Sequence, residues 1–197
     1  MEENVVKAAV LLSGSGRTLA NLLAKRATGE LGLEISAVIS SRSDVRGVEV
    51  ARAAGIACEI FCRRDFDSSA DHNKAINKWL ESHGPRIIIL AGYLCYYITP
   101  DWFDGPVVNI HPALLPKYGG KGYYGDRVHE AVLAAGDSRS GCTVHLVDDQ
   151  YDTGRILGQQ EVAVEPGDNV ATLAARVFAA ECELYPRVLS RLAADLG

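Results

Sequence analysis

The sequence predicts an α/β protein built on a doubly wound, mostly parallel sheet with helices on both faces. Short apolar runs with β-branched residues recur between longer segments of helical pattern. Strands that alternate with helices imply a parallel sheet covered on both faces, because each crossover returns the chain to the same end of the sheet. After residue 141 two strand-like runs follow each other directly, which predicts an antiparallel extension near the C-terminal part.

The elements of the parallel part can be placed along the chain. Strands are expected at residues 8–12, 35–39, 58–61, 87–91 and 107–110. Helices are expected at residues 18–28, 45–54, 68–82 and 127–135. The two late strands are expected at residues 142–147 and 155–164, with a polar loop between them.

A last, long helix is expected at residues 170–195. Asp168 and Asn169 precede it, and both residue types are favourable N-caps. Leu173, Val177 and Leu184 follow at roughly helical spacing, which indicates one apolar face.

Composition limits the class of protein. A chain of 197 residues is expected to form a single domain over 1–197. The formal charge of −5, with dispersed Lys and Arg, does not favour a nucleic-acid partner. The first apolar run stops at Leu12, too short for a signal peptide or a membrane span, so a cytoplasmic protein is expected.

The five cysteines are odd in number and form no close-spaced pair of metal-binding type. Four of them stand in apolar stretches, where a reduced thiol behaves as a small hydrophobic side chain. They are interpreted as core residues, with Cys95 as the exception.

The segment between the first strand and the first helix is a candidate phosphate site. It contains Gly14, Ser15, Gly16, Arg17 and Thr18. Glycines let the backbone approach a ligand closely, and the N–H groups of a helix start favour an anion. The alternative is an ordinary tight turn between a strand and a helix.

A dinucleotide site is less favoured at this turn. Leu19 stands where the third glycine of the fingerprint would be, and the second strand ends in Ser40, Ser41 and Arg42 without the acid that holds an NAD ribose. A mononucleotide is the better interpretation.

Asn109 and His111 form the second candidate site, at the end of the fifth strand and just before Pro112. Residues two apart in an extended segment point to the same side, so both side chains can meet one ligand atom. Ligands of doubly wound sheets bind at the carboxyl edge of the strands. A structural histidine with satisfied hydrogen bonds is the alternative.

The polar turn at residues 147–154 is the third candidate. It contains Asp148, Asp149 and Asp152, followed by Gly154. Asp and Gly are common in turns because side-chain oxygens bond the local backbone, so a plain connection is the alternative. No second segment with metal ligands accompanies these acids, so no metal is expected.

The three segments, in this order, resemble the phosphoribosylglycinamide formyltransferases, and the similarity extends over essentially the whole chain. The matching stretches are the Gly-Ser-Gly turn and residues 90–94 (LAGYL), 109–118 (NIHPALLPKY), 143–145 (TVH) and 152–154 (DTG). The resemblance implies an enzyme of purine biosynthesis that moves a formyl group from 10-formyltetrahydrofolate to the amine of glycinamide ribonucleotide. The formyl-folate is a cosubstrate, and a formyltransferase fold of the Rossmann-like kind is implied with it.

By this resemblance Asn109, His111 and Asp152 are the catalytic set. Asn109 and a protonated His111 would donate to the formyl oxygen as negative charge develops there. Asp152 would favour the charged imidazole and help to move a proton from the attacking amine to the departing folate nitrogen.

The resemblance also implies the binding residues. Gly14 to Thr18 would hold the phosphate of glycinamide ribonucleotide, and Glu181 would accept hydrogen bonds from its ribose, unless Glu181 is merely an exposed helical acid. The folate pocket is implied for Leu94, Cys95, Tyr96, Tyr97, Asn109, Asp148 and Asp152.

The sequence departs from the family pattern at three positions. Thr18 stands where the family often has Asn, and Ser69 and Cys95 stand where it often has Arg near the folate tail. Arg63 or Arg64 would have to compensate at the tail carboxylates.

The glycine-rich stretch 119–125 is longer than usual in the family. It is expected to act either as a lid or as a flexible loop.

Two other functions stay open. Another formyl-folate transferase or hydrolase would share the same Asn, His and Asp, but those proteins carry further domains for which 197 residues leave no room. A non-catalytic nucleotide sensor on the same fold would bind glycinamide ribonucleotide without folate chemistry. The expected assembly is a monomer or a homodimer with small-molecule substrates.

Overall fold

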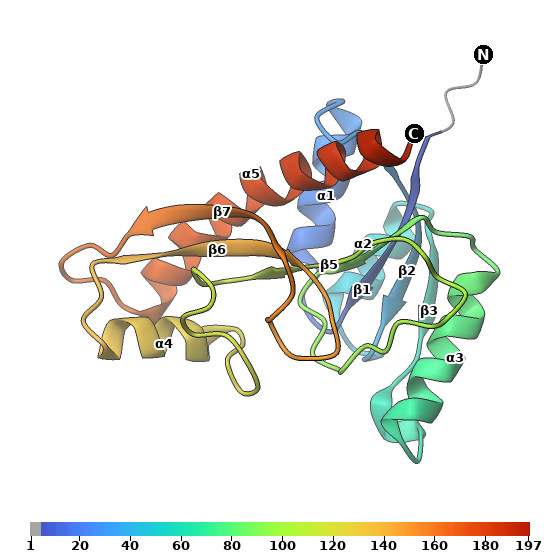
Figure 1. Cartoon of the computed structure of the whole chain (residues 1–197), viewed down its shortest axis with the longest axis horizontal. Helices are drawn as coiled ribbons and strands as arrows, with labels where there is room; N and C mark the ends of the chain where they lie inside the picture. The colour runs from blue at the N-terminus through green and yellow to red at the C-terminus, as the bar shows by residue number, and fades with distance from the viewer. Residues whose placement is uncertain (1–4) are drawn as a thin grey trace. The chain divides into compact units, whose positions relative to one another are not determined.

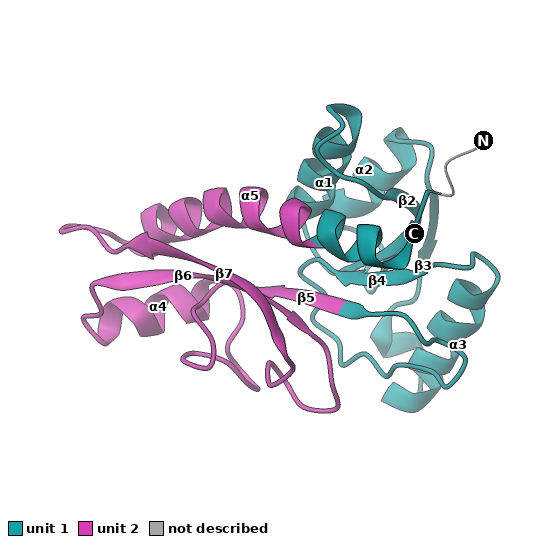
Figure 2. Cartoon of the chain, turned by 45° about the horizontal axis from the view of Figure 1, so that its top comes forward, with its two compact units in different colours: residues 1–107, 189–197 teal, residues 108–188 magenta. Residues whose placement is uncertain are grey.

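The computed structural model describes residues 5–197. By its internal contacts the chain divides into two compact units (Figure 2). The first unit comprises Met1–Val107 and Leu189–Gly197, and the second comprises Val108–Val188. The single domain expected over 1–197 stays a prediction.

The first unit is built around a parallel four-stranded arrangement in the order β3-β2-β1-β4 (Figure 1). Its strands are β1 (Lys7–Leu12), β2 (Glu34–Ser40), β3 (Ala57–Ile60) and β4 (Ile87–Leu90). Residues Ala8 to Leu12 of β1 are fully buried, as are Ile87 to Ile89 of β4. Central parallel strands are covered on both faces, which explains why they are continuous apolar runs rather than alternating ones.

The helices of the first unit connect these strands. They are α1 (Arg17–Ala27), α2 (Arg46–Ala53), the 3-10 turn η1 (Arg63–Asp65) and α3 (Ser69–Glu81). Ser68 caps α3 by accepting a hydrogen bond from the N–H of Asp71. The final turns of the C-terminal helix also belong to this unit, where Ser190 Oγ accepts a hydrogen bond from the N–H of Gly32.

The second unit holds the antiparallel strands that the sequence predicts after residue 141. It consists of β5 (Val107–His111), β6 (Arg139–Leu146), β7 (Ile156–Ala163), α4 (Asp126–Ala134) and the larger part of α5 (Val170–Leu196). β6 pairs in antiparallel register with both β5 and β7. Helices α4 and α5 lie on opposite sides of β6 and β7 in both views (Figures 1 and 2).

Helix α5 begins with a reciprocal cap. Asn169 Oδ1 accepts from the N–H of Thr172, and Thr172 Oγ1 accepts from the N–H of Asn169. Leu173, Val177 and Leu184 are buried, as the helical spacing predicts. Pro186 lies inside the helix and removes one backbone donor, and the buried side chains before and after it keep the helix packed.

The predicted elements are confirmed with ends that differ by a residue or so, apart from the start of β6. That strand begins at Arg139 rather than at residue 142. Glycine is uncommon in strands, so the local pattern at residue 141 does not indicate one. Glycine is needed there because a Cβ would lie 2.1 Å from the carbonyl oxygen of Gln160 on β7. The close pairing of two strands, which the local sequence does not display, therefore selects glycine. The 3-10 turn η1 was not predicted.

Candidate active site

The predicted phosphate loop leads from β1 into α1 within the first unit. Gly16 is the N-cap of α1, has a φ of 71°, and no side chain caps the helix start. A Cβ at Gly16 would lie 2.5 Å from Cα of Gly47, so both the dihedral angle and the close approach require glycine. A helix start without a side-chain cap has backbone N–H groups that suit an anion.

The predicted folate segment 94–97 is tied to this loop. The N–H of Leu94 donates to Ser13 Oγ at 2.9 Å, and Ser13 Oγ also lies 2.6 Å from Ser41 Oγ. Helix α3 also holds the segment, because Asn73 Nδ2 donates to the carbonyl of Tyr96. The structure thus places Leu94 beside Ser13, the residue that precedes the predicted phosphate loop, inside the first unit.

Within that segment the side chains differ in what they can offer a ligand. Leu94 is 55% exposed, whereas Tyr97 is only 3% exposed and donates its hydroxyl to Asn77 Oδ1. Of the two arginines considered for the folate tail, Arg63 donates to Ser69 Oγ and to the carbonyl of Phe66. Arg64 lies on the surface beside Asp65.

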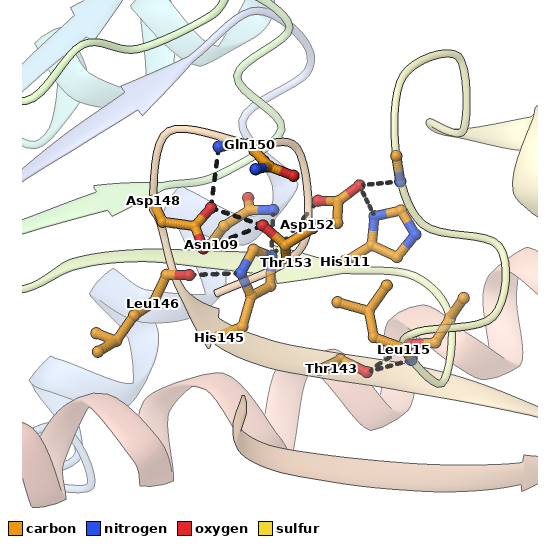
Figure 3. A network of polar contacts seen from close by, with 12 residues as sticks. Asn109, His111, Leu115, Thr143, His145, Leu146, Asp148, Gln150, Asp152 and Thr153 are labelled. Carbon is orange, nitrogen blue, oxygen red and sulfur yellow. Dashed lines mark hydrogen bonds and ion pairs between the residues drawn. The ribbon is translucent and has the colours of Figure 1, made fainter. Parts of the chain in front are cut away.

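The three predicted catalytic residues converge inside the second unit (Figure 3). Asn109 and His111 lie on β5, and the turn between β6 and β7 carries Asp152 toward them. Asp152 Oδ2 is 3.6 Å from His111 Nδ1, and Asp152 Oδ1 is 3.5 Å from His145 Nε2. Asp152 has a φ of 60°, a conformation that Asp and Asn adopt more readily than most residues.

Hydrogen bonds determine which nitrogen of each imidazole carries a proton. A carbonyl oxygen only accepts, so His111 Nε2 donates to the carbonyl of Tyr118 at 2.8 Å, and His145 Nδ1 donates to that of Leu146 at 2.8 Å. Asn109 Nδ2 in turn donates to His145 Nε2 at 3.1 Å. One N–H of the Asn109 amide therefore bonds His145 and orients the amide group.

Electrostatics corrects one expectation. Burial lowers the pKa of His111 below its ordinary value of 6.5 and outweighs the opposing effects of Asp152 and of the hydrogen bond to Tyr118. The expectation that Asp152 keeps this ring charged near neutral pH is therefore wrong for the substrate-free protein. The neutral ring has its proton on Nε2, and Nδ1 faces Asp152 without one.

Asp152 itself is a carboxylate at neutral pH. Burial alone would raise its pKa, but its contacts with His145 and His111 and the hydrogen bond from the Gly120 N–H lower it below 3.8. The site thus holds a neutral imidazole beside a negative charge, an arrangement that stabilises a proton arriving at His111 Nδ1.

The acids of the turn divide into two roles. Asp148 accepts hydrogen bonds from Thr153 Oγ1 and from the N–H of Gln150, so its carboxylate holds the turn in shape (Figure 3). Asp149 is exposed. Among the three acids considered, Asp152 points to the two histidines.

Glu181 lies on α5 in the second unit and is partly buried, so it is not merely an exposed helical acid. Burial and then the nearby charge of Glu181 raise the pKa of the Cys142 thiol to about 12, which keeps that cysteine protonated.

All five cysteines are free thiols, and Cys62 and Cys142 are buried.

Sequence reasoning gave no role to His145, Tyr118 or Thr143. His145 and Thr143 pair with Asn109 and His111 across the two strands, so the register of β5 and β6 would have identified them. Thr143 Oγ1 donates to the carbonyl of Ala113 and accepts from the N–H of Leu115, which fixes the chain after His111.

Among residues 5–197, no group of three or more His, Cys, Asp or Glu side chains has the arrangement of a metal site. Within the same residues, no helix combines the length and apolar character needed to cross a membrane.

Known proteins resemble this chain over most of its length. The family model described as formyl transferase matches residues 6–189. The chain belongs to the formyl transferase family. The resemblance to the phosphoribosylglycinamide formyltransferases is confirmed, and so is the expectation of a formyltransferase enzyme.

Relatives of similar length carry that name. Phosphoribosylglycinamide formyltransferase of Haemophilus influenzae is 36% identical over 186 residues, which cover 93% of this chain and 85% of that protein. The protein of the same name from Escherichia coli is 34% identical over 184 residues, which cover 92% of this chain and 84% of that protein.

Solved structures confirm the fold class. Glycinamide ribonucleotide transformylase 1 from Symbiobacterium toebii superposes with a TM-score of 0.90 at 32% identity and covers 97% of this chain and 89% of its own. Phosphoribosylglycinamide formyltransferase from Brucella melitensis has a TM-score of 0.86 at 39% identity, with 97% of each chain covered. The α/β prediction with an antiparallel C-terminal part is thereby confirmed.

Proposed function

We propose that this formyltransferase moves the formyl group of 10-formyltetrahydrofolate to the amine of glycinamide ribonucleotide, a step of purine biosynthesis. The convergence of Asn109, His111 and Asp152 carries the proposal. An amide donor, a neutral imidazole and a buried carboxylate are the groups that acyl transfer to an amine requires. The names of the relatives supply the acceptor, glycinamide ribonucleotide, and the group that is transferred. The formyl-folate donor is the one that the sequence resemblance implies.

Asn109 is proposed to stabilise the developing oxyanion. Attack of the amine on the formyl carbon converts the carbonyl oxygen to an alkoxide, which needs a donor already in place. The Asn109 N–H that His145 does not take is such a donor, and His145 keeps the amide nitrogen toward the site. An oriented donor of this kind contributes about 10²–10³ in turnover.

His111 is proposed to carry the proton. The attacking amine loses a proton as it forms the C–N bond, and His111 Nδ1 accepts it, since Nε2 already holds the proton donated to Tyr118. The resulting imidazolium is stabilised by Asp152 at 3.6 Å and can donate to the oxyanion. Release of the proton to the departing folate nitrogen restores the neutral ring, so no covalent enzyme intermediate or metal is involved.

The binding residues follow the same proposal. Gly14, Ser15, Gly16, Arg17 and Thr18 would hold the phosphate at the start of α1, and Glu181 would accept from the ribose. Leu94, Cys95, Tyr96, Tyr97 and Asp148 would line the folate pocket together with Asn109 and Asp152. Location in the cytoplasm and a monomeric or homodimeric state stay predictions.

One assay tests the function. Enzyme, 10-formyl-5,8-dideazafolate and glycinamide ribonucleotide are mixed, and deformylation is followed by absorbance. A rise in deformylated folate that requires glycinamide ribonucleotide supports the proposal. Deformylation without any acceptor would instead indicate a hydrolase, and binding of glycinamide ribonucleotide with no absorbance change would indicate a sensor.

A further inference from the structure

The hydrogen bond that orients His111 depends on an unusual backbone position. Tyr118, whose carbonyl accepts from His111 Nε2, has a φ of 58°, in the left-handed region that non-glycine residues rarely occupy. Such a conformation costs roughly 1–2 kcal/mol and persists only where surrounding contacts enforce it. The contacts at Tyr118 therefore identify what holds the acceptor for His111.

The Tyr118 side chain is anchored to Asp137, the second residue after the C-cap of α4. Its hydroxyl donates to Asp137 Oδ2 at 2.7 Å. Lys117 Nζ reaches both oxygens of the same carboxylate, at 2.8 and 2.6 Å. The hydrogen bonds with Lys117 and then Tyr118 lower the pKa of Asp137, so the anchor is a charged carboxylate at neutral pH.

The anchored stretch supports two groups of the catalytic site. The carbonyl of Tyr118 binds the His111 ring, and two residues later the N–H of Gly120 donates to Asp152 Oδ2 at 2.9 Å. Gly119 lies between them, and its backbone packs closely on Leu115, since a Cβ at residue 119 would lie 2.6 Å from a methyl carbon of Leu115. The backbone of residues 118–120 therefore has little room to shift. A shift of Tyr118 would therefore disturb both His111 and Asp152.

We propose that Tyr118 and Asp137 are positioning residues for the formyl transfer. Their hydrogen bond holds the strained backbone at residue 118, so that the Tyr118 carbonyl retains the proton on His111 Nε2 and leaves Nδ1 as the proton acceptor beside Asp152. Neither side chain is assigned a contact with substrate. The inference deepens the proposed function and rests on its assignment of His111.

Two variants and a matched control test the proposal. Tyr118→Phe removes only the hydroxyl, Asp137→Asn removes the charge that receives it, and Lys117→Gln removes the exposed partner while the Tyr118–Asp137 bond remains. Turnover and KM are measured for both substrates. Titration of the His111 ring is followed by NMR without substrate, and thermal melting confirms that each variant is folded.

The expected result separates positioning from charge. Tyr118→Phe and Asp137→Asn each lower kcat by about tenfold with KM changed by less than about twofold, because alignment rather than binding is lost. The pKa of His111 moves further down, since a well-placed carbonyl acceptor favours the protonated ring. Lys117→Gln stays close to the parent in both measurements, as surface ion pairs are weak.

Three other groups act electrostatically on His111 and stay unchanged in these variants. They are Asp152 in the turn, His145 on β6 and His129 on α4. A His129→Gln variant identifies the His129 signal, so that it is not mistaken for that of His111, since burial lowers the pKa of both rings.

Unchanged kcat and unchanged His111 titration in Tyr118→Phe would overturn the proposal. An equal shift of the His111 pKa in Lys117→Gln would also overturn it, because the effect would then be one of charge alone. The NMR titration needs no substrate. The expected shift of the His111 pKa in Tyr118→Phe, together with no formyl transfer to glycinamide ribonucleotide by the parent protein, would therefore contradict the proposed function. It would leave the positioning role of Tyr118 supported.

Discussion

The Nδ1 atom of His111 lies 3.6 Å from the Oδ2 atom of Asp152, although the two residues are 41 positions apart in the sequence. His111 is 4% exposed, and its pKa is lowered by burial, while Asp152 stays ionised. A buried neutral base beside a carboxylate is suited to receive a proton and to release it again within one turnover. The first two predictions concern this pair.

We expect Asp152→Asn to lower turnover by roughly two orders of magnitude or more with little change in melting temperature. Asn tolerates the left-handed backbone at residue 152 and keeps the size of the side chain, but it cannot stabilise an imidazolium by charge. Turnover is measured with both substrates saturating. Asp149→Asn, in the same turn and exposed, is the control. Should Asp149→Asn be the impaired variant, or both be active, Asp152 is not the catalytic acid.

We expect kcat to rise with pH through an apparent pKa below 6.5. The neutral form of His111 is the proton acceptor, and burial lowers the pKa of this ring, so activity is lost only as pH falls through that lowered value. His111→Gln should lose about a hundredfold or more in kcat and no longer show this limb. A kcat that instead falls as pH rises past 6.5 would show that the charged imidazole is the active form.

We expect Gly16→Ala to destabilise the protein by about 2 kcal/mol or more, because a left-handed backbone and contact with Gly47 both oppose a Cβ. Gly14→Ala should be close to neutral, since no atom lies within 4 Å of a Cβ at that position. Melting curves of the two variants provide the comparison. Because a substitution at Gly16 also lowers stability, it cannot by itself test phosphate binding. Equal melting temperatures would contradict the close approach of α1 and α2.

We expect unfolding free energy to decrease as pH falls below 6.5. Burial lowers the pKa of His72, His111 and His129, so the unfolded chain binds protons between those lowered values and 6.5 while the folded chain does not. Stability is full above 6.5 and declines by up to about 1.4 kcal/mol per pH unit for each histidine. Urea unfolding at pH 7.5 and 5.5 measures this.

His72→Gln is the matched variant for the pH experiment. Gln can still donate to the carbonyl of Phe61, as His72 Nε2 does, but it does not titrate. The loss between pH 7.5 and 5.5 should therefore be smaller in this variant than in the parent. An identical loss would mean that His72 does not contribute to the pH dependence.

Prediction from sequence was most successful where the signal is local. The alternation of apolar strands and helices identified each strand and α-helix, and the two-residue spacing of Asn109 and His111 placed both on one side of β5. Local signals failed at Gly141, whose close contact with Gln160 depends on a neighbouring strand, and at the 3-10 turn η1. Motif resemblance brought in Asp152, which the turn composition alone could not distinguish from Asp148 and Asp149.

The sequence by itself determined the fold class and the family, and it singled out the three residues that we propose as the catalytic set, because hydrophobic periodicity and motif order are read directly along the chain. Only the tertiary structure decided the direction in which the pKa of His111 is shifted, the orientation of Asn109 through His145 and the acceptor at Tyr118. The physical reason is that burial and hydrogen-bond partners arise from segments distant in sequence. A nearby carboxylate raises the pKa of a histidine in water, but desolvation lowers the pKa when burial of the ring outweighs that attraction.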